Sequence, residues 1–179
     1  MDRKEFLKAC TGGLCACAAT CLPAGAEPVK EDWRWGFLKR RYAKLLNLLS
    51  ETMDEKSLQQ TLFKLGTYCS AEYDERLAKV RGDVAGFAEQ VRTSSSGDIV
   101  MVDGKTGVVT MASPERTECF CPLNSVTAKT PGVVCNCSLG WQTHSWETVL
   151  QKKVRVELKE AVLRGGKRCV FEIHAADKA

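Results

Sequence analysis

Cysteine constrains this chain more than any other feature of its sequence. Ten cysteines occur among 179 residues, in an amino-terminal group and a later group. The first group is Cys10, Cys15, Cys17 and Cys21, and the later group is Cys69, Cys119, Cys121, Cys135, Cys137 and Cys169. A thiol content this high predicts disulfides, a metal site or thiol chemistry, and it favours an exported or metal-binding protein.

The amino terminus has the parts of an export signal. A basic start at Arg3 and Lys4 is followed by an uncharged stretch over 9–22 and then by the small residues Ala24-Gly25-Ala26. This order is typical of a cleavable signal peptide. The uncharged stretch is shorter than the roughly 20 apolar residues that span a bilayer, which argues against a membrane helix.

The same segment resembles a twin-arginine export signal. Its Arg3-Lys4-Glu5-Phe6-Leu7 string carries a lysine where the second arginine of that motif usually stands. We therefore expect a signal peptide over 1–26 and one folded domain over 27–179. The twin-arginine or the general secretory route would carry the domain to the periplasm or another extracytoplasmic compartment, so the export machinery is an expected partner.

Charge limits the other partners. The chain has 26 basic and 22 acidic residues, which are mixed along its length and give a net charge of +4. A nucleic-acid-binding protein normally gathers its basic residues on one face, so we expect no nucleic-acid partner. One stretch, over 31–50, does carry clustered cations opposite its apolar residues. We interpret it as a packed helix with a solvated basic outer face.

The hydrophobic pattern predicts helices first and hairpins afterwards. Apolar residues at steps of three and four predict helices over 31–50, 55–69, 83–92 and 142–150. Alternating apolar residues predict one hairpin from strands over 99–102 and 108–111, and another from strands over 154–159 and 168–173. The sequence therefore predicts an α+β fold, in which amino-terminal helices pack on an antiparallel sheet built from hairpins, with a β-hairpin at the carboxyl end.

Two Cys-x-Cys pairs, Cys119-Phe120-Cys121 and Cys135-Asn136-Cys137, lie between the predicted hairpins. Residues two apart on a strand share a face, and facing residues on adjacent antiparallel strands approach to about 4.5–5.5 Å. If each pair lies on a strand, four sulfurs converge. We expect Trp141 to pack in the core beside them, and Cys169 to point into the core with Phe171 and stay outside the cluster.

Three chemistries remain open for these cysteines. A metal ion such as zinc, or an iron–sulfur cluster, would use the thiolates of Cys119, Cys121, Cys135 and Cys137, with Cys69 as an extra or substitute ligand. Cross-strand disulfides would suit an oxidising compartment. A catalytic thiol, with Cys137 as the candidate, would need a neighbouring acid–base group, and His144 and Glu147 share a predicted helix face nearby.

The later half of the chain also resembles known families as an ordered set of motifs. The set comprises Cys135-Asn136-Cys137-Ser138-Leu139-Gly140-Trp141, Glu147, Val154-x-Val156-x-Leu158 and Gly165-Gly166-x-x-Cys169-x-Phe171-x-Ile173. It is similar to the carboxyl-terminal part of the L-2-amino-thiazoline-4-carboxylic acid hydrolase-like families. It more distantly resembles the 4-vinyl-reductase-like small-molecule-binding domains. Leu65-Gly66-x-x-Cys69 is similar to a helical element of the hydrolase-like group.

The resemblance implies an α+β ligand-binding domain with a cysteine-lined pocket between helices and sheet. Its chemistry would be either hydrolysis of a small C–N or C–S heterocycle or binding of a ligand without turnover, and a fold does not choose between them. We therefore expect an exported protein that binds a metal or a small molecule through its Cys-x-Cys pairs. The alternatives are the heterocycle hydrolase and a disulfide-stapled exported domain.

Overall fold

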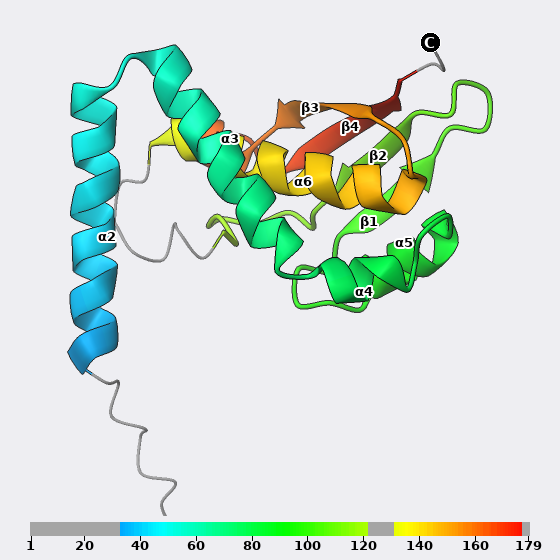
Figure 1. Ribbon diagram of the computed structural model, residues 1–179, viewed down its shortest axis with the longest axis horizontal. Coiled ribbons are helices and arrows are strands. Elements are labelled where there is room, and N and C mark those ends of the chain that lie inside the picture. Colours follow the sequence, from blue (N-terminus) through cyan, green and yellow to red (C-terminus); the bar gives the residue numbers. More distant parts are fainter. Residues whose placement is uncertain (1–32, 122–130, 177–179) are drawn as a thin grey trace, which may run out of the picture. The chain divides into compact units, whose positions relative to one another are not determined.

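The structure is a computed structural model that describes residues 33–121 and 131–176 (Figure 1). The predicted signal peptide over 1–26 lies outside the described residues. By its contacts the chain divides into two compact units, Met1–Trp35 and Gly36–Ala179. The fold below is that of the second unit.

Five α-helices are described, and the three helices predicted before the first hairpin are confirmed. The helices are α2 (Trp33–Thr52), α3 (Glu55–Ala71), α4 (Asp74–Ala78), α5 (Val84–Arg92) and α6 (Cys135–Leu150). Aspartates fix two of the starts, because the Asp54 carboxylate accepts from the Ser57 N–H at 2.9 Å and the Asp83 carboxylate accepts from the Gly86 N–H at 2.8 Å. Among the described residues, none of these helices is long and apolar enough to cross a membrane.

One antiparallel sheet contains both predicted hairpins. Its strands are β1 (Ile99–Val102), β2 (Val109–Ala112), β3 (Val154–Glu160) and β4 (Val170–Ala175), in the order β1-β2-β4-β3. Phe171 of β4 is the central position, because it pairs with Met111 on one side and Leu158 on the other. The predicted α+β class and the carboxyl-terminal hairpin are confirmed.

Helix α6 lies across one face of this sheet and α3 crosses α6 (Figure 1). The core on that face centres on Trp146, which has 0% of its surface exposed and meets the ring of Phe87 edge-on at 5.0 Å. The prediction for Trp141 is wrong. Trp146 follows Trp141 by five positions on the helix, so the two rings point in different directions. Half-buried Trp141 instead contacts the ring of Tyr73, with the ring centroids 5.2 Å apart.

The first turns of α6 differ from the sequence prediction. We expected the helix over 142–150, after a turn at Ser138-Leu139-Gly140, but it begins at Cys135. Gly140 is a helical residue, and a Cβ there would lie 1.9 Å from the carbonyl oxygen of Phe63 on α3. A Cβ on Gly66 of α3 would lie 1.8 Å from the carbonyl oxygen of Cys137. Both glycines therefore allow the two helix backbones to touch.

A second apolar cluster holds α2 and α3 to the start of α6. Its buried members are Leu46, Leu58, Leu62 and Val134. Tyr42, Leu49 and Cys137 pack against it. The cluster covers one face of α2, while Leu38, Leu45 and Leu48 of the same helix stay exposed.

Candidate metal-binding site

A small cavity with a volume of about 20 Å³ lies where α6 meets β3 and β4. Apolar side chains form most of its wall, and four cysteines and one serine supply its polar atoms. The lining residues are Cys119, Cys121, Val134, Cys135, Ser138, Leu158, Ala161, Leu163, Cys169 and Phe171.

Three separate segments supply the four cysteines. Cys119 and Cys121 lie on the irregular segment that follows β2, Cys135 is the first residue of α6, and Cys169 directly precedes β4. Cys135 is buried and the other three are half-buried. Soft sulfur atoms are therefore gathered at one place from positions far apart in the sequence.

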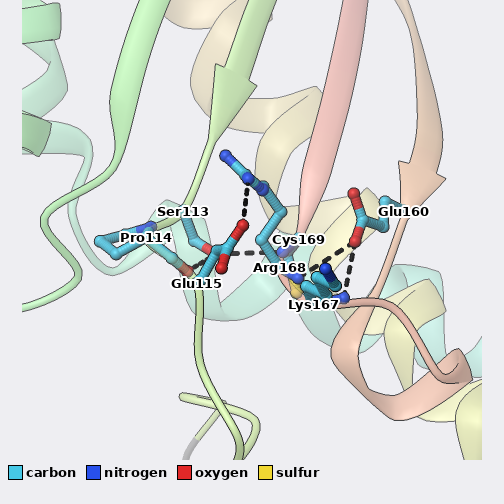
Figure 2. Close-up of polar contacts among 7 residues, drawn as sticks. All are labelled: Ser113, Pro114, Glu115, Glu160, Lys167, Arg168 and Cys169. Atoms are coloured by element: carbon cyan, nitrogen blue, oxygen red, sulfur yellow. Dashed lines mark hydrogen bonds and ion pairs between the residues drawn. The ribbon is translucent and has the colours of Figure 1, made fainter.

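Backbone and side-chain hydrogen bonds fix the segment after β2 to the start of β4 (Figure 2). The Ser113 N–H donates to the Cys169 carbonyl at 2.9 Å, and the Cys169 N–H donates to the Ser113 hydroxyl oxygen at 3.0 Å. Next to them, the Arg168 guanidinium donates to the Glu115 carboxylate at 2.6 Å. These contacts hold Cys169 in place relative to β2.

Glu160 closes the turn between β3 and β4 on the other side of the site. One of its carboxylate oxygens accepts from the N–H groups of Lys167 at 2.6 Å and Arg168 at 3.3 Å (Figure 2). A Cβ on Gly166 would lie 2.5 Å from the Glu160 Cγ, so the side chain can fold over the turn only because that residue is glycine. Gly165 has a φ of 88°, which is a left-handed conformation that glycine adopts readily.

The predicted set of four ligands is split by the helix. Residues two apart on an α-helix point about 200° apart, so Cys135 and Cys137 cannot face the same cavity. Cys135 lines it, whereas Cys137 packs with the second apolar cluster near Tyr42. The prediction that this pair lies on a strand is wrong.

Cys169 takes the place in the cavity that we expected Cys137 to occupy. The prediction that Cys169 stays outside the cysteine cluster is also wrong, although its side chain does pack against the core of the sheet. The sequence did contain a pattern that predicts this position of Cys169. Cys169 and Phe171 alternate on one strand face, and Phe171 lines the same cavity.

Burial raises the pKa of two of the cavity thiols, Cys135 and Cys169. Burial raises the pKa of Cys135 to about 11, against the opposing effect of the nearby Arg164 guanidinium. It also raises the pKa of Cys169. On the other side of α6, burial and then the neighbouring sulfurs of Cys121 and Cys69 raise the pKa of Cys137 to about 12.

The four cysteines line the cavity, but among the described residues no three of their sulfurs all lie within 4.8 Å of one another. In the part of the chain that the structure describes, the six cysteines form no disulfides with one another. Among the described residues, one group of three potential metal ligands has all its ligand atoms within 4.8 Å of one another. It consists of Glu157, Glu172 and His174 on the sheet. The Lys159 ammonium already lies 3.4 Å from Glu157 and 3.2 Å from Glu172, so these residues form an ion-pair network.

The structure does not bring the catalytic candidates together. His144 lies seven residues after Cys137, which is about 10 Å along the helix axis. Its Nδ1 lies 3.1 Å from the hydroxyl of Ser70, and its Nε2 lies 3.6 Å from the carboxylate of Asp74. Ser70 is fully buried, so its hydroxyl group is not open to a substrate. Glu147 forms an ion pair with Lys153 at 3.0 Å.

Comparison with known proteins identifies the fold. No protein-family model matches the chain, and no curated protein matches it. Among solved structures, trafficking protein particle complex subunit 3 from Naegleria fowleri, covalently bound to palmitic acid, matches with a TM-score of 0.54 and 15% identity. The match covers 81% of this chain and 96% of that one.

A vinyl-4-reductase family protein from Methanocaldococcus jannaschii also matches, with a TM-score of 0.40 and 14% identity over 84% of this chain and 85% of that one. At such low identities a structural match speaks for fold and not for function. The chain therefore has an α+β fold similar to that of the Naegleria trafficking protein subunit.

Proposed function

We propose that this protein binds a thiophilic metal ion in the cavity, through the thiolates of Cys119, Cys121, Cys135 and Cys169. The observation that carries the proposal is the convergence of four cysteines from three segments on one small cavity. Thiolates are preferred ligands of zinc and copper(I), and structural zinc sites commonly have four cysteines. The ligand set differs from the one that the Cys-x-Cys motifs predicted, because Cys169 replaces Cys137.

The size of the cavity favours an ion over an organic ligand. A cavity needs about 10–15 Å³ to hold one water molecule. The volume of about 20 Å³ is therefore enough for a single ion and too small for even a small heterocycle. It is also too small for a fatty acid such as the palmitic acid carried by the Naegleria protein, and a mononuclear ion fits it better than an iron–sulfur cluster.

Metal loading would draw the cysteines closer together. Thiolates on one zinc ion, with Zn–S distances near 2.3 Å, lie about 3.8 Å apart in a tetrahedral site. Cys135 and Cys169 are fixed by α6 and β4, whereas Cys119 and Cys121 lie on an irregular segment. We expect that segment to close over the ion. Because the ligands must lose their protons, loading releases protons and its affinity rises with pH.

We also propose that the protein works outside the cytoplasm, as the residues of the amino terminus predict. Thiols in an oxidising compartment are converted to disulfides unless something protects them. A bound ion would protect the cavity cysteines, because a thiolate that is coordinated to a metal is less available for oxidation. The metal proposal therefore expects the cavity cysteines to stay reduced, whereas the disulfide-stapled alternative expects them to be oxidised.

The test compares two cysteine variants in the processed chain that begins at Glu27, which lacks the four amino-terminal cysteines. Reduced protein is titrated anaerobically with zinc against a competing chelator, and bound zinc is measured. We expect about one equivalent in the parent protein, loss of that equivalent in Cys169→Ser, and retention in Cys137→Ser. Cys137 is a matched control, because it too is a half-buried thiol whose pKa is raised by burial. Retention in Cys169→Ser with loss in Cys137→Ser would refute the proposed ligand set.

A further inference from the structure

Helix α2 carries a row of exposed leucines. Leu38, Leu45 and Leu48 are 56%, 50% and 41% exposed. Together with Arg41 they lie at successive helical steps of three, four and three, so they share one face. We call Leu38, Arg41, Leu45 and Leu48 the leucine stripe. A neighbouring face of α2 packs through Leu46 into the second apolar cluster.

The leucine stripe lies in a strongly cationic stretch. From Trp33 to Ser50 the helix has five basic residues and no acidic ones. The basic residues are Arg34, Lys39, Arg40, Arg41 and Lys44. Arg40, Arg41 and Lys44 are exposed. The sequence prediction of a basic outer face is correct, but three large apolar side chains interrupt that face, so it is not the ordinary solvated side of a helix.

Charge distinguishes between the surfaces that could cover the stripe. In a symmetric pairing of two copies, the same patch meets itself, so the cations of one α2 would lie against those of the other. A nucleic acid would match the charge but would leave the leucines against phosphates and water. Lipid headgroups with acyl chains beneath them match both parts, because interfacial helices combine Lys and Arg with Leu, Phe and Trp.

We propose that α2 binds the surface of an anionic membrane through the leucine stripe. The three leucines enter the boundary between headgroups and acyl chains, and Arg40, Arg41 and Lys44 lie near lipid phosphates. The proposal rests on α2 alone and does not depend on the metal site. A helix with three half-exposed leucines would bind reversibly and in a salt-dependent way.

The test is sedimentation of the full chain with vesicles of phosphatidylcholine alone or mixed with phosphatidylglycerol. We expect binding only to the anionic vesicles, a blue shift of tryptophan emission on binding, and release by high salt. Replacing Leu38, Leu45 and Leu48 together by serine, or reversing Arg41 and Lys44 to glutamate, should weaken binding at least about tenfold. The control replaces Ile99 and Met101, which are similarly exposed on β1, by serine and should bind within about twofold of the parent.

Circular dichroism and urea unfolding would show that each variant is folded. Two results would overturn the proposal. One is equal binding to neutral and anionic vesicles, or binding to neither. The other is a dimer in sedimentation equilibrium that the leucine substitutions dissociate, because it would show that a second copy covers the stripe.

Discussion

Two hydrogen bonds join Ser113 and Cys169. The Ser113 N–H donates to the Cys169 carbonyl at 2.9 Å, and the Cys169 N–H donates to the Ser113 hydroxyl oxygen at 3.0 Å. The first bond is backbone to backbone and extends the pairing of β2 with β4 by one step. The second depends on the serine side chain. A single hydroxyl group thus fixes the backbone of a proposed metal ligand from a segment 56 residues away.

Replacing Ser113 by alanine should weaken the site more than the fold. We expect the free energy of unfolding to fall by about 1 kcal/mol, from the loss of one partly buried hydrogen bond. Zinc affinity should fall by about tenfold or more, as is usual when a group that orients a metal ligand is removed. The control is Ser50→Ala, because the Ser50 hydroxyl donates to the Leu46 carbonyl within α2. Equal zinc affinity in both variants would argue against a role for Cys169.

Adding one methyl group where α3 and α6 touch should be severely destabilising. In Gly140→Ala the new Cβ would lie 1.9 Å from the Phe63 carbonyl oxygen, so the helices must move apart. We expect a loss of about 3 kcal/mol or more in denaturant unfolding. Gly104→Ala is the matched control, because a Cβ there meets nothing within 4 Å. If the two variants unfold at the same denaturant concentration, the helices do not cross at Gly140.

Trp146 and Trp141 should differ in their contributions to stability. Trp146→Ala removes a fully buried ring and should cost about 3–5 kcal/mol. Trp141→Ala removes a half-buried ring with one edge-on contact to Tyr73, and about 1–2 kcal/mol is expected. Urea unfolding of the two variants measures the difference. A larger loss of stability in Trp141→Ala than in Trp146→Ala would support the sequence-based prediction that Trp141 packs in the core.

Tyr42 should make stability decline at high pH. Burial, with smaller effects of nearby Cys137, Cys121 and Cys69, raises the pKa of Tyr42 from 10.0 to about 12. A group whose pKa is higher in the folded chain binds its proton more tightly there. Its contribution is complete below pH 10 and disappears as the pH rises toward 12.

Tyr42→Phe should therefore reduce the decline in stability over that interval, as measured by urea unfolding of the metal-free protein. At neutral pH it should cost little, because the buried Tyr42 hydroxyl has no hydrogen-bond partner among the described residues. A parallel loss of stability in parent and variant from pH 10 to 12 would count against burial of this hydroxyl.

Processing of the amino terminus is testable separately. We expect intact-mass measurement on protein from the native host to find a chain that begins near Glu27, because Ala24-Gly25-Ala26 is a suitable cleavage site. Replacing Ala24 and Ala26 by larger residues should leave the precursor uncleaved. A native protein that still begins at Met1 would contradict the export signal.

Local patterns were sufficient to predict most of the elements. The alternation of Val154, Val156 and Leu158 identified β3, and the steps between apolar residues identified α2, α3 and α5. The start of α6 could not be found in this way. Gly140 suggested a turn, but it lies within α6, and the reason for a glycine there is the close approach of the Phe63 carbonyl of α3, which is distant in sequence.

The set of cysteines that lines the cavity was missed for a related reason. A Cys-x-Cys spacing gathers two sulfurs only on an extended chain, so the unexpected helix at Cys135 separated that residue from Cys137. The replacement, Cys169, comes from a strand whose contact with α6 depends on tertiary packing. The cysteine-lined pocket between helix and sheet, by contrast, is what the family resemblance implied.

The cavity cysteines extend from position 119 to position 169, and the last of them is fixed only when β2 pairs with β4. During synthesis, a chain that has not yet paired these strands holds its thiols apart. If the cavity binds an ion as proposed, capture of the ion must follow completion of the sheet, and its release must involve movement of the segment that carries Cys119 and Cys121 or opening of that strand pair. The occupancy of the site would then report whether this protein has finished folding.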